Sequence, residues 1–241
     1  MRFAILSDIH SNLEALAAVL AQLAPADGVL CLGDIVGYGP DPNACVALIR
    51  ERAKETVLGN HDVAAIDGGG LENFNGAARK AIEWTQTVLA ADHVAWLDAL
   101  SYEVRLPEYL MVHGAPVDYF KYVLDKAAAA EAFAATDAPL VFIGHSHIAE
   151  CYALAPNGSI AHMHHQHGGE LVLERGTRYI VNPGSVGQPR DLNPDASYAY
   201  YEPGEQRISW RRVPYRIDLV QQKMDAARLP ESCARRLALG R

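Results

Sequence analysis

Short apolar runs alternate with longer stretches of helical periodicity from the N-terminus up to residue 147. Each run has the length and the β-branched or leucine content of a buried strand, and Gly or a polar turn residue follows it. Strands that alternate with helices predict an α/β fold with a largely parallel, buried sheet. The runs that predict strands are Phe3 to Leu6, Gly28 to Leu32, Thr56 to Leu58, Tyr109 to Val112 and Pro139 to Ile143.

Two of the predicted helices begin with capping signals. Residues 11–14, Ser-Asn-Leu-Glu, have the form of a capping box in which Ser11 caps the helix and Glu14 reaches back to it. Asp41 and Pro42 are the residue types of an N-cap and a first helical residue, and they precede a predicted helix over Asn43 to Glu51.

Residues 63–100 depart from the alternation of strands and helices. They contain two predicted helices, Asn75 to Leu89 and Asp92 to Leu100, without a strand between them. We therefore expect a small helical insertion beside the strand ends. The Ala-rich stretch from Lys126 to Ala135 predicts one more helix.

Beyond residue 147 the pattern becomes all-β and then helical. Asn157-Gly158 is a two-residue hairpin signal between Glu150–Ala155 and Ser159–Met163. Residues 215–241 predict a C-terminal helical segment, broken near Pro230, and we expect all of these elements to form a single domain over residues 1–241. Three further strands are predicted at Arg178–Val181, Ser197–Tyr201 and Arg207–Val213.

Side chains that can bind metal ions follow five successive predicted strands. In open α/β sheets, ligands bind outside the carboxyl ends of the strands, so these side chains should meet. An Asp or Asn after a strand is commonly a turn residue, but turn chemistry does not explain His recurring in the same place. The candidate metal ligands are Asp8, His10, Asp34, Asn60, His113, His145 and His147.

The types of these side chains fit a pair of metal ions. Carboxylate, imidazole and amide oxygen without thiolate suit manganese, iron, cobalt or zinc. The four cysteines are far apart and form no C-x-x-C pair, which argues against a zinc–thiolate site or a disulfide framework. Two cations roughly 3.5–4 Å apart can share a carboxylate, hold a hydroxide between them and clamp a phosphoryl group during in-line displacement.

Over roughly residues 1 to 202, the chain resembles the calcineurin-like metallophosphoesterase family. The motifs stand in the order of that family: Asp8-Ile9-His10, Gly33-Asp34, Gly59-Asn60-His61-Asp62, His113-Gly114 and Gly144-His145-Ser146-His147. The resemblance implies a four-layer αββα sandwich, in which two mixed β-sheets are flanked by helices.

The resemblance also implies a role for each candidate residue. Asp34 bridges two divalent metal ions, and His61 is the acid that protonates the leaving group; the other reading of His61 is a group that only orients Asn60. One metal is held by Asp8, His10 and His147, and the other by Asn60, His113 and His145.

Two further stretches narrow the subfamily. Phosphoprotein phosphatases of the family carry an Asp where this chain has Gly37, so the Asp–His pair of those enzymes cannot form in the same way. Residues 37–40 and 182–190 resemble instead a small bacterial branch that includes phosphodiesterases and hydrolases of diadenosine polyphosphates. We therefore expect a metal-dependent hydrolase of nucleotide-like phosphodiesters or phosphoanhydrides. The alternatives are a phosphomonoesterase or phosphoprotein phosphatase, and a non-catalytic scaffold on the same fold.

Four other features allow two interpretations each. Arg190 either binds substrate phosphate oxygens through its planar fork or is a surface arginine paired with Asp191, and both remain open. Tyr38 either stacks on a nucleobase or packs locally, and Asp62 either orients His61 or caps the next segment; the second reading is favoured for both. The His-rich tract is interpreted as a solvated loop that binds metals adventitiously rather than as a third metal site; it comprises His162, His164, His165 and His167.

Charge and hydropathy exclude some classes of partner. The formal net charge of −8 argues against a protein that grips nucleic-acid backbones, since such binding relies on Lys and Arg. It is compatible with a small phosphorylated substrate, because bound metal ions supply local positive charge. Neither a membrane span nor a signal peptide is apparent in the sequence, so a cytoplasmic enzyme is expected.

Overall fold

Side chains of strand β1 (Phe3–Leu6) alternate between two hydrophobic cores, and this alternation sets the layers of the fold. Phe3 and Ile5 lie in the core between two sheets, whereas Ala4 and Leu6 lie in a core that includes helices α1 (Leu13–Gln22) and α2 (Pro42–Arg52). The computed structural model describes residues 2–23 and 28–241.

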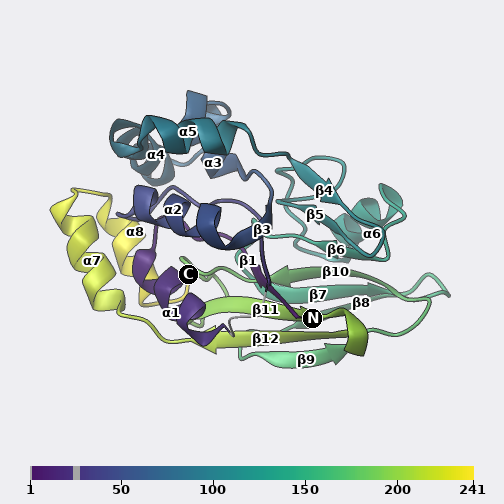
Figure 1. The fold of residues 1–241 in the computed structure, drawn as a ribbon. Coiled ribbons are helices and arrows are strands. Elements are labelled where there is room, and N and C mark those ends of the chain that lie inside the picture. The colour runs from purple at the N-terminus through teal and green to yellow at the C-terminus, as the bar shows by residue number, and fades with distance from the viewer. Residues whose placement is uncertain (1, 24–27) are drawn as a thin grey trace.

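The described residues form two six-stranded sheets that pack face to face (Figure 1). The first sheet has the order β3 (Ala53–Thr56), β2 (Gly28–Cys31), β1, β11 (Ala196–Glu202), β12 (Arg207–Val213) and β9 (Gly169–Val172). The second has the order β4 (Glu103–Arg105), β5 (Leu110–Val112), β6 (Leu140–Phe142), β10 (Arg178–Pro183), β7 (Ala149–Leu154) and β8 (Ile160–His164).

Both sheets are mixed. Strands β1, β2 and β3 run parallel in the first sheet, and β5, β6 and β10 run parallel in the second. The other pairs are antiparallel, because the chain beyond β6 returns largely through hairpins. The expected two mixed sheets are confirmed. The strands predicted from the alternation up to residue 147 do pair in parallel, but they are divided between the two sheets instead of forming one.

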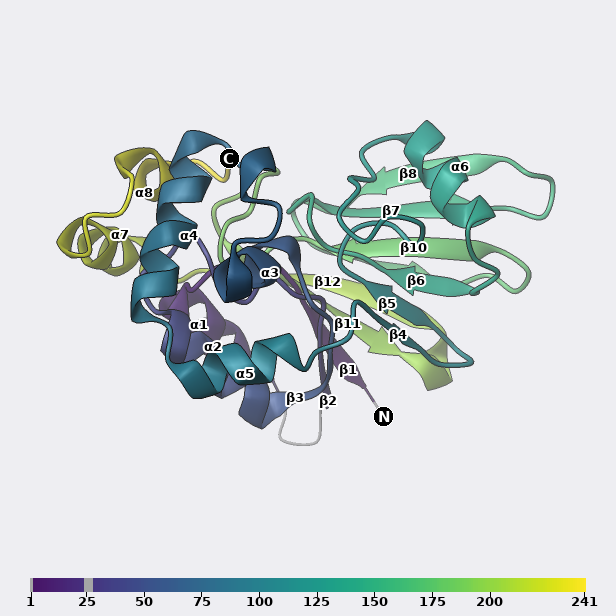
Figure 2. The same cartoon turned by 90° about the horizontal axis from the view of Figure 1, so that it is seen from above.

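Helices cover the outer faces of both sheets. Helices α1 and α2 pack on the first sheet, and α6 (Lys126–Ala134) packs on the second through Ala129 and Phe133. Figure 2 shows α6 over β7 and β8, while the other helices gather at the opposite end of the molecule. The four-layer αββα arrangement is therefore confirmed. None of the helices in the described ranges has the length and apolar content that crossing a membrane requires.

The predicted helical insertion and the C-terminal helices lie next to each other. Helices α7 (Ile217–Ala226) and α8 (Glu231–Leu237) share a small core with α4 through Ala81, Met224 and Leu237. The insertion consists of α3 (Asn60–Asp67), a 3₁₀ turn (Leu71–Asn73), α4 (Gly76–Val88) and α5 (Ala91–Asp98), and a second 3₁₀ turn, Pro203–Glu205, precedes β12.

The proposed capping box at the first helix is wrong. Asn12 is the N-cap of α1, and its Oδ1 accepts a hydrogen bond from Ala15 N at 3.1 Å. Ser11 lies one residue too early, with a left-handed backbone (φ 53°), and its N–H donates to the carbonyl of Ile35 at 2.9 Å. The loop after β1 is thus held by the loop after β2, and the helix begins only beyond that contact.

The edge strands differ most from the sequence prediction. β3 covers Ala53–Thr56, not Thr56 to Leu58, and α3 begins at Asn60 itself. Strands β4 and β9 were not predicted. All three strands lie at sheet edges and are partly exposed, so their residues lack a continuous apolar pattern.

The His-rich tract is not a loop throughout. His162 and His164 belong to β8, in register with β7, and the ring of His165 stacks on Trp210 with centroids 3.7 Å apart. The solvated-loop interpretation is therefore wrong for His162 and His164, which continue the second strand of the predicted hairpin, and for His165, which follows the strand but is packed on Trp210.

Candidate metal centre

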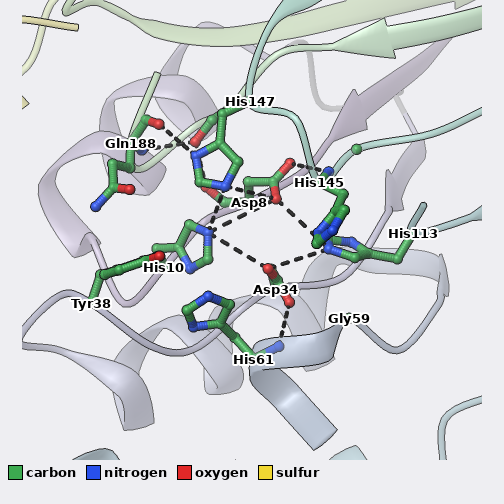
Figure 3. A network of polar contacts seen from close by, with 12 residues as sticks. Asp8, His10, Asp34, Tyr38, Gly59, His61, His113, His145, His147 and Gln188 are labelled. Atoms are coloured by element: carbon green, nitrogen blue, oxygen red, sulfur yellow. Dashed lines mark hydrogen bonds and ion pairs between the residues drawn. The ribbon is translucent and has the colours of Figure 1, made fainter. Parts of the chain in front are cut away.

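The loops after β1, β2, β5 and β6 meet at one end of the sandwich, as the sequence predicted for these strand ends. Asp8 N donates to the carbonyl of Gly33 at 3.1 Å, and Gly144 N donates to the carbonyl of His113 at 2.8 Å. Between the sheets, His145 N donates to Asp8 Oδ2 at 3.1 Å. These backbone contacts bring all but one of the candidate ligands into one cluster of polar side chains (Figure 3).

The backbone is strained where the candidate ligands lie. Five of them have a left-handed backbone, a conformation that non-glycine residues adopt at a cost of roughly 1–3 kcal/mol each. Such strain persists only where the surrounding structure holds it, and it is typical of functional sites. The φ angles are 53° for Asp8, 49° for His10, 52° for Asp34, 65° for His145 and 61° for His147.

The two aspartates are oriented in the same way. One oxygen of each accepts a backbone N–H: Asp8 Oδ2 from His145, and Asp34 Oδ1 from His61 at 2.8 Å. The other oxygen of each faces imidazoles, with Asp8 Oδ1 lying 3.3 Å from His147 Nε2. Within the described part of the chain, Asp8 Oδ1 is buried and accepts no hydrogen bond, which leaves it free to bind a cation.

Three histidines present their Nε2 atoms to these carboxylates. The Nδ1 of His10 donates to the carbonyl of Val36 at 3.1 Å, that of His113 to Leu32 at 2.7 Å, and that of His147 to Gln188 at 2.6 Å. Since a carbonyl oxygen only accepts, each ring carries a proton on Nδ1 and turns its Nε2 inward. A histidine held in this way is typical of metal sites.

The geometry fits divalent cations. The ligand atoms of Asp8, His10, Asp34 and His147 lie within 4.8 Å of one another, and so do those of Asp34, His113 and His145. The Nε2 atoms of His10 and His147 are only 3.1 Å apart. Burial lowers the pKa of both rings, so they face each other as neutral groups with opposed lone pairs. A cation between them would relieve that repulsion.

Asp34 belongs to both groups of ligand atoms. Its Oδ2 lies 3.7 Å from His10 Nε2 and 3.3 Å from His113 Nε2. Burial acts to raise the pKa of Asp34, but the imidazoles, His113 first, outweigh it and hold the pKa below its ordinary value. Burial acts in the opposite direction on His113, yet the Asp34 charge raises the pKa of that ring to about 9. Asp34 is thus ionised, as a carboxylate that binds a cation must be.

Asn60 is the first residue of α3, next to the groups of carboxylates and imidazoles. In the described chain its Oδ1 is buried without a hydrogen-bond partner. Asn60 lines a cavity of about 530 Å³ together with His61 and His145. An unpartnered amide oxygen at the floor of this cavity suits a ligand of a hard or borderline cation.

Aromatic side chains form much of the wall of this cavity. Tyr122 stacks on the ring of His145 with centroids 3.8 Å apart, and Phe74 lies edge-on to His61 at 4.7 Å. Phe120 and Tyr38 complete this wall. Apart from Tyr38, these residues were not predicted from the sequence. The run Tyr-Phe-Lys-Tyr at 119–122, which is unusually aromatic for a segment between a strand and a helix, was the available signal.

His61 is buried and held by rings and backbone. Its centroid lies 4.7 Å from that of His10 and 4.5 Å from that of Tyr38, and burial lowers its pKa to about 4. Gly37 packs against it: a Cβ at residue 37, where φ is +91°, would lie 2.3 Å from His61 Nδ1. The position that carries Asp in phosphoprotein phosphatases therefore accommodates no side chain here without moving His61.

The carboxylate of Asp62 accepts hydrogen bonds from backbone N–H groups rather than from the ring of His61. Its Oδ2 accepts from the N–H of Gly59, the N-cap of α3, at 3.1 Å, and its Oδ1 accepts from Ile35 N and Val36 N. The favoured capping interpretation is confirmed, although Asp62 lies at the third helical position. The same carboxylate also ties α3 to the loop that carries Asp34.

Arg190 contacts Tyr38, which lines the cavity. Its Nη2 is 3.0 Å from Gln188 Oε1 and 3.4 Å from the hydroxyl of Tyr38. Asp191 pairs with Arg212 instead, so the predicted alternative of an Arg190–Asp191 pair is wrong. The second guanidinium near Tyr38 is that of Arg236 in α8, and the sequence analysis did not identify it. No Asp or Glu side chain of the described residues pairs with either guanidinium, and Arg236 Nε donates to the backbone oxygen of Arg241.

The chain is similar to several known proteins over its whole length. A family model for the calcineurin-like phosphoesterase superfamily domain matches residues 1–205. An uncharacterized protein of Methanocaldococcus jannaschii is 37% identical over 246 residues, covering 99% of this chain and 98% of that protein. The crystal structure of a metallophosphoesterase from Sphaerobacter thermophilus has a TM-score of 0.89 and 41% identity, with 100% of both chains covered. A hypothetical protein of Pyrococcus horikoshii OT3 shares the fold, with a TM-score of 0.78, 16% identity, and 100% of this chain and 98% of that chain covered.

The position of Asp34 in both groups of ligand atoms leads to a prediction about metal binding. Asp34→Asn removes one charge and one carboxylate oxygen, while its amide oxygen can still accept from His61 N. We expect metal content, measured by elemental analysis after dialysis, to fall for both ions. Asp118→Asn is the matched control, since Asp118 lines the same cavity but belongs to neither group, and it should keep its metal. Two tightly held ions in Asp34→Asn would contradict the shared position.

Proposed function

Since this chain belongs to the calcineurin-like phosphoesterase superfamily, we propose that it hydrolyses nucleotide-like phosphodiesters or phosphoanhydrides with the help of two divalent metal ions. One observation carries the proposal. A buried carboxylate, Asp34, is common to two groups of metal-binding side chains, and the second group borders an aromatic-walled cavity of about 530 Å³. This combination supports a reactive centre directly beside a site for a large planar group.

The ligand sets follow from the two groups of side chains. Asp34 serves both ions, and manganese, iron, zinc or cobalt suits this mixture of oxygen and nitrogen ligands. Bound divalent ions supply Lewis acidity toward phosphoryl oxygens and activate water for attack. We assign Asp8, His10 and His147 to one ion, and Asn60, His113 and His145 to the other.

His61 is proposed as the acid that protonates the leaving oxygen. It lines the cavity next to Asn60, and its Nδ1 is buried without a hydrogen-bond partner among the described residues. Its lowered pKa reflects burial, and the negative charge of a bound phosphate would raise it again. The surrounding rings of His10, Tyr38 and Phe74 hold the imidazole in place. In the alternative role, His61 would only orient Asn60, and its imidazole would take no part in a reaction in the cavity.

The cavity wall favours a nucleoside-like group on the substrate. Aromatic rings offer planar faces on which a base can stack, worth about 1–3 kcal/mol per base. Tyr122 already stacks on His145, so a base beside Tyr122 would lie next to a proposed metal ligand. A small phosphomonoester would leave most of this wall unused.

The two arginines favour a substrate with more than one negative charge. Burial lowers the pKa of the Arg236 guanidinium, and the nearby charge of Arg190 lowers it further. Two guanidiniums close enough to repel each other, on a chain of net charge −8, form a local positive patch. Forked donors of this kind bind phosphate oxygens in a bidentate manner. A phosphoanhydride, or a diester with neighbouring phosphates, would offer phosphate oxygens to both guanidiniums.

A substrate comparison tests the proposed function. With both ions bound, kcat/KM should be at least about tenfold higher for an aryl phosphodiester or a diadenosine polyphosphate than for the matching aryl monoester; tenfold corresponds to about 1.4 kcal/mol. A preference for the monoester would favour the phosphomonoesterase alternative. No turnover of any ester by protein with two bound ions would favour the scaffold.

The role of His61 can be tested with a series of leaving groups. His61→Asn should retain both ions but slow esters of basic leaving groups by about 10²–10⁴-fold, the usual contribution of general-acid catalysis. Esters of acidic phenols need little help and should lose much less. The measurement is a plot of kcat against leaving-group pKa for both proteins. An equal loss across the series would rule out proton donation by His61.

The position of Arg190 leads to a prediction about phosphate binding. Arg190→Ala should lower kcat/KM by roughly 10- to 100-fold, as expected when a charge-assisted contact worth about 1.5–3 kcal/mol is lost. Arg190→Lys should restore little, since Lys cannot make a bidentate contact. Arg211→Ala removes an exposed arginine paired with Glu170 and is the control, expected to behave as the unaltered protein. An unchanged kcat/KM in Arg190→Ala with both ions bound would show that this guanidinium does not touch the substrate.

A further inference from the structure

A third group of possible metal ligands lies on the face of the second sheet that α6 covers. Glu150 of β7 is opposite His164 of β8, and Tyr152 is opposite His162. Side chains two residues apart on a strand point to the same face, so Glu150, His162 and His164 lie together. Tyr152 belongs to the core beneath α6, whereas Cys151 belongs to the core between the sheets, which identifies this face as the outer one.

The three side chains are close enough to share one ion. Glu150 Oε2 lies 2.7 Å from His162 Nε2 and 4.0 Å from His164 Nδ1, and all three ligand atoms lie within 4.8 Å of one another. Exposure increases from Glu150 at 1% through His162 at 17% to His164 at 58%. The group therefore has a buried carboxylate at its base and an open side toward solvent, through which an ion and its waters can enter.

Neighbouring side chains orient the buried carboxylate. Ser146 Oγ donates to Glu150 Oε1, and the hydroxyl of Tyr152 donates to Oε2, each at 3.3 Å. The ring of Tyr152 also stacks on His162, with centroids 4.1 Å apart and planes inclined by 18°. Outer-shell contacts of this kind fix the ligands of metal sites. Here they hold two of the three ligands before any ion binds.

A hydrogen bond between Glu150 and His162 does not by itself explain the group. Such a pair would leave His164 without a function, although its ring lies 4.3 Å from that of His162. Burial raises the pKa of Glu150 to about 7, because the hydroxyls and imidazoles around it do not fully compensate the buried charge. A divalent cation would compensate that charge and would engage all three side chains at once.

We propose that Glu150, His162 and His164 bind one divalent metal ion, zinc in the first place, separately from the Asp34 centre. Two imidazoles and one carboxylate are an established zinc ligand set, with solvent completing the coordination. The absence of thiolate also admits cobalt or nickel.

The site would stabilise the loop that carries two candidate ligands of the main centre. Ser146 lies between His145 and His147, and its hydroxyl also accepts from Asn182 Nδ2 at 2.9 Å. An ion that fixes Glu150 therefore fixes Ser146, and it also cross-links β7 to β8. The role is structural support, so the turnover number with all ions bound should change only within a few-fold when the site is removed.

The test compares a double variant, His162→Gln with His164→Gln, with the single variant His167→Gln. His167 belongs to the same His-rich tract but contacts Gln166 rather than Glu150, so it is the matched control. Metal-depleted full-length proteins are titrated with zinc chloride, and bound zinc is measured by elemental analysis and calorimetry. We expect the unaltered protein and the control to bind one more equivalent of zinc than the double variant, and cobalt loading to show one additional absorption signature. The expected difference of one zinc equivalent between the two variants does not depend on how many ions the Asp34 centre binds.

Two further measurements guard against misfolding and loose binding. The single variant His164→Gln changes an exposed side chain, so it should fold normally while weakening the extra zinc by at least about tenfold. Zinc should also raise the melting temperature of the double variant less than that of the control. Equal zinc stoichiometry in the double variant and the unaltered protein would overturn the proposal. Equal loss in His167→Gln would overturn it too, since the His-rich tract would then bind zinc only loosely.

Discussion

The carboxylate of Asp34 lies entirely inside the protein, where an uncompensated charge would cost several kcal/mol. Three contacts compensate it: the N–H of His61 on one oxygen, and the rings of His113 and His10 near the other. These partners come from α3, from the loop after β5 and from the loop after β1. One buried charge therefore holds together segments from both sheets and from the helical insertion, and the other candidate ligands are arranged around it.

Close backbone approach makes this arrangement possible. A Cβ at Gly59 would lie 2.2 Å from Asp34 Oδ1, and one at Gly144 would lie 1.9 Å from Ser7 Oγ. Glycine at these two positions allows the loops to pack against the aspartates without a side chain between them. The left-handed backbones of the candidate ligands persist because hydrogen bonds between these closely packed loops hold them in place.

The outer parts of the cleft come from segments that are far apart in the sequence. Tyr122 and Phe120 come from the segment between β5 and α6, Phe74 from the insertion, and Arg236 from the C-terminal helix α8. The strand-end loops thus supply the proposed metal ligands, whereas the additions to the sandwich supply aromatic surface and positive charge. Such a division is typical of folds in which the sheet framework carries the reactive site and added segments shape the surface around it.

The sequence by itself determined the elements whose pattern is strong. Buried strands such as Phe3 to Leu6 are recognised by their apolar runs, and candidate ligands such as Asp8 and His145 by their recurrence directly after those runs. Edge strands β4 and β9 were not predicted, because partly exposed strands do not need a continuous run of apolar residues. Only the tertiary structure decided that Asn12 rather than Ser11 caps α1, that Arg190 faces Tyr38 rather than Asp191, and that Glu150 meets His162 and His164. The first two outcomes depend on contacts between segments distant in the chain, about which local residue types carry no information. The third depends on the register and the exposed face of the β7–β8 hairpin, which the turn signal alone does not determine.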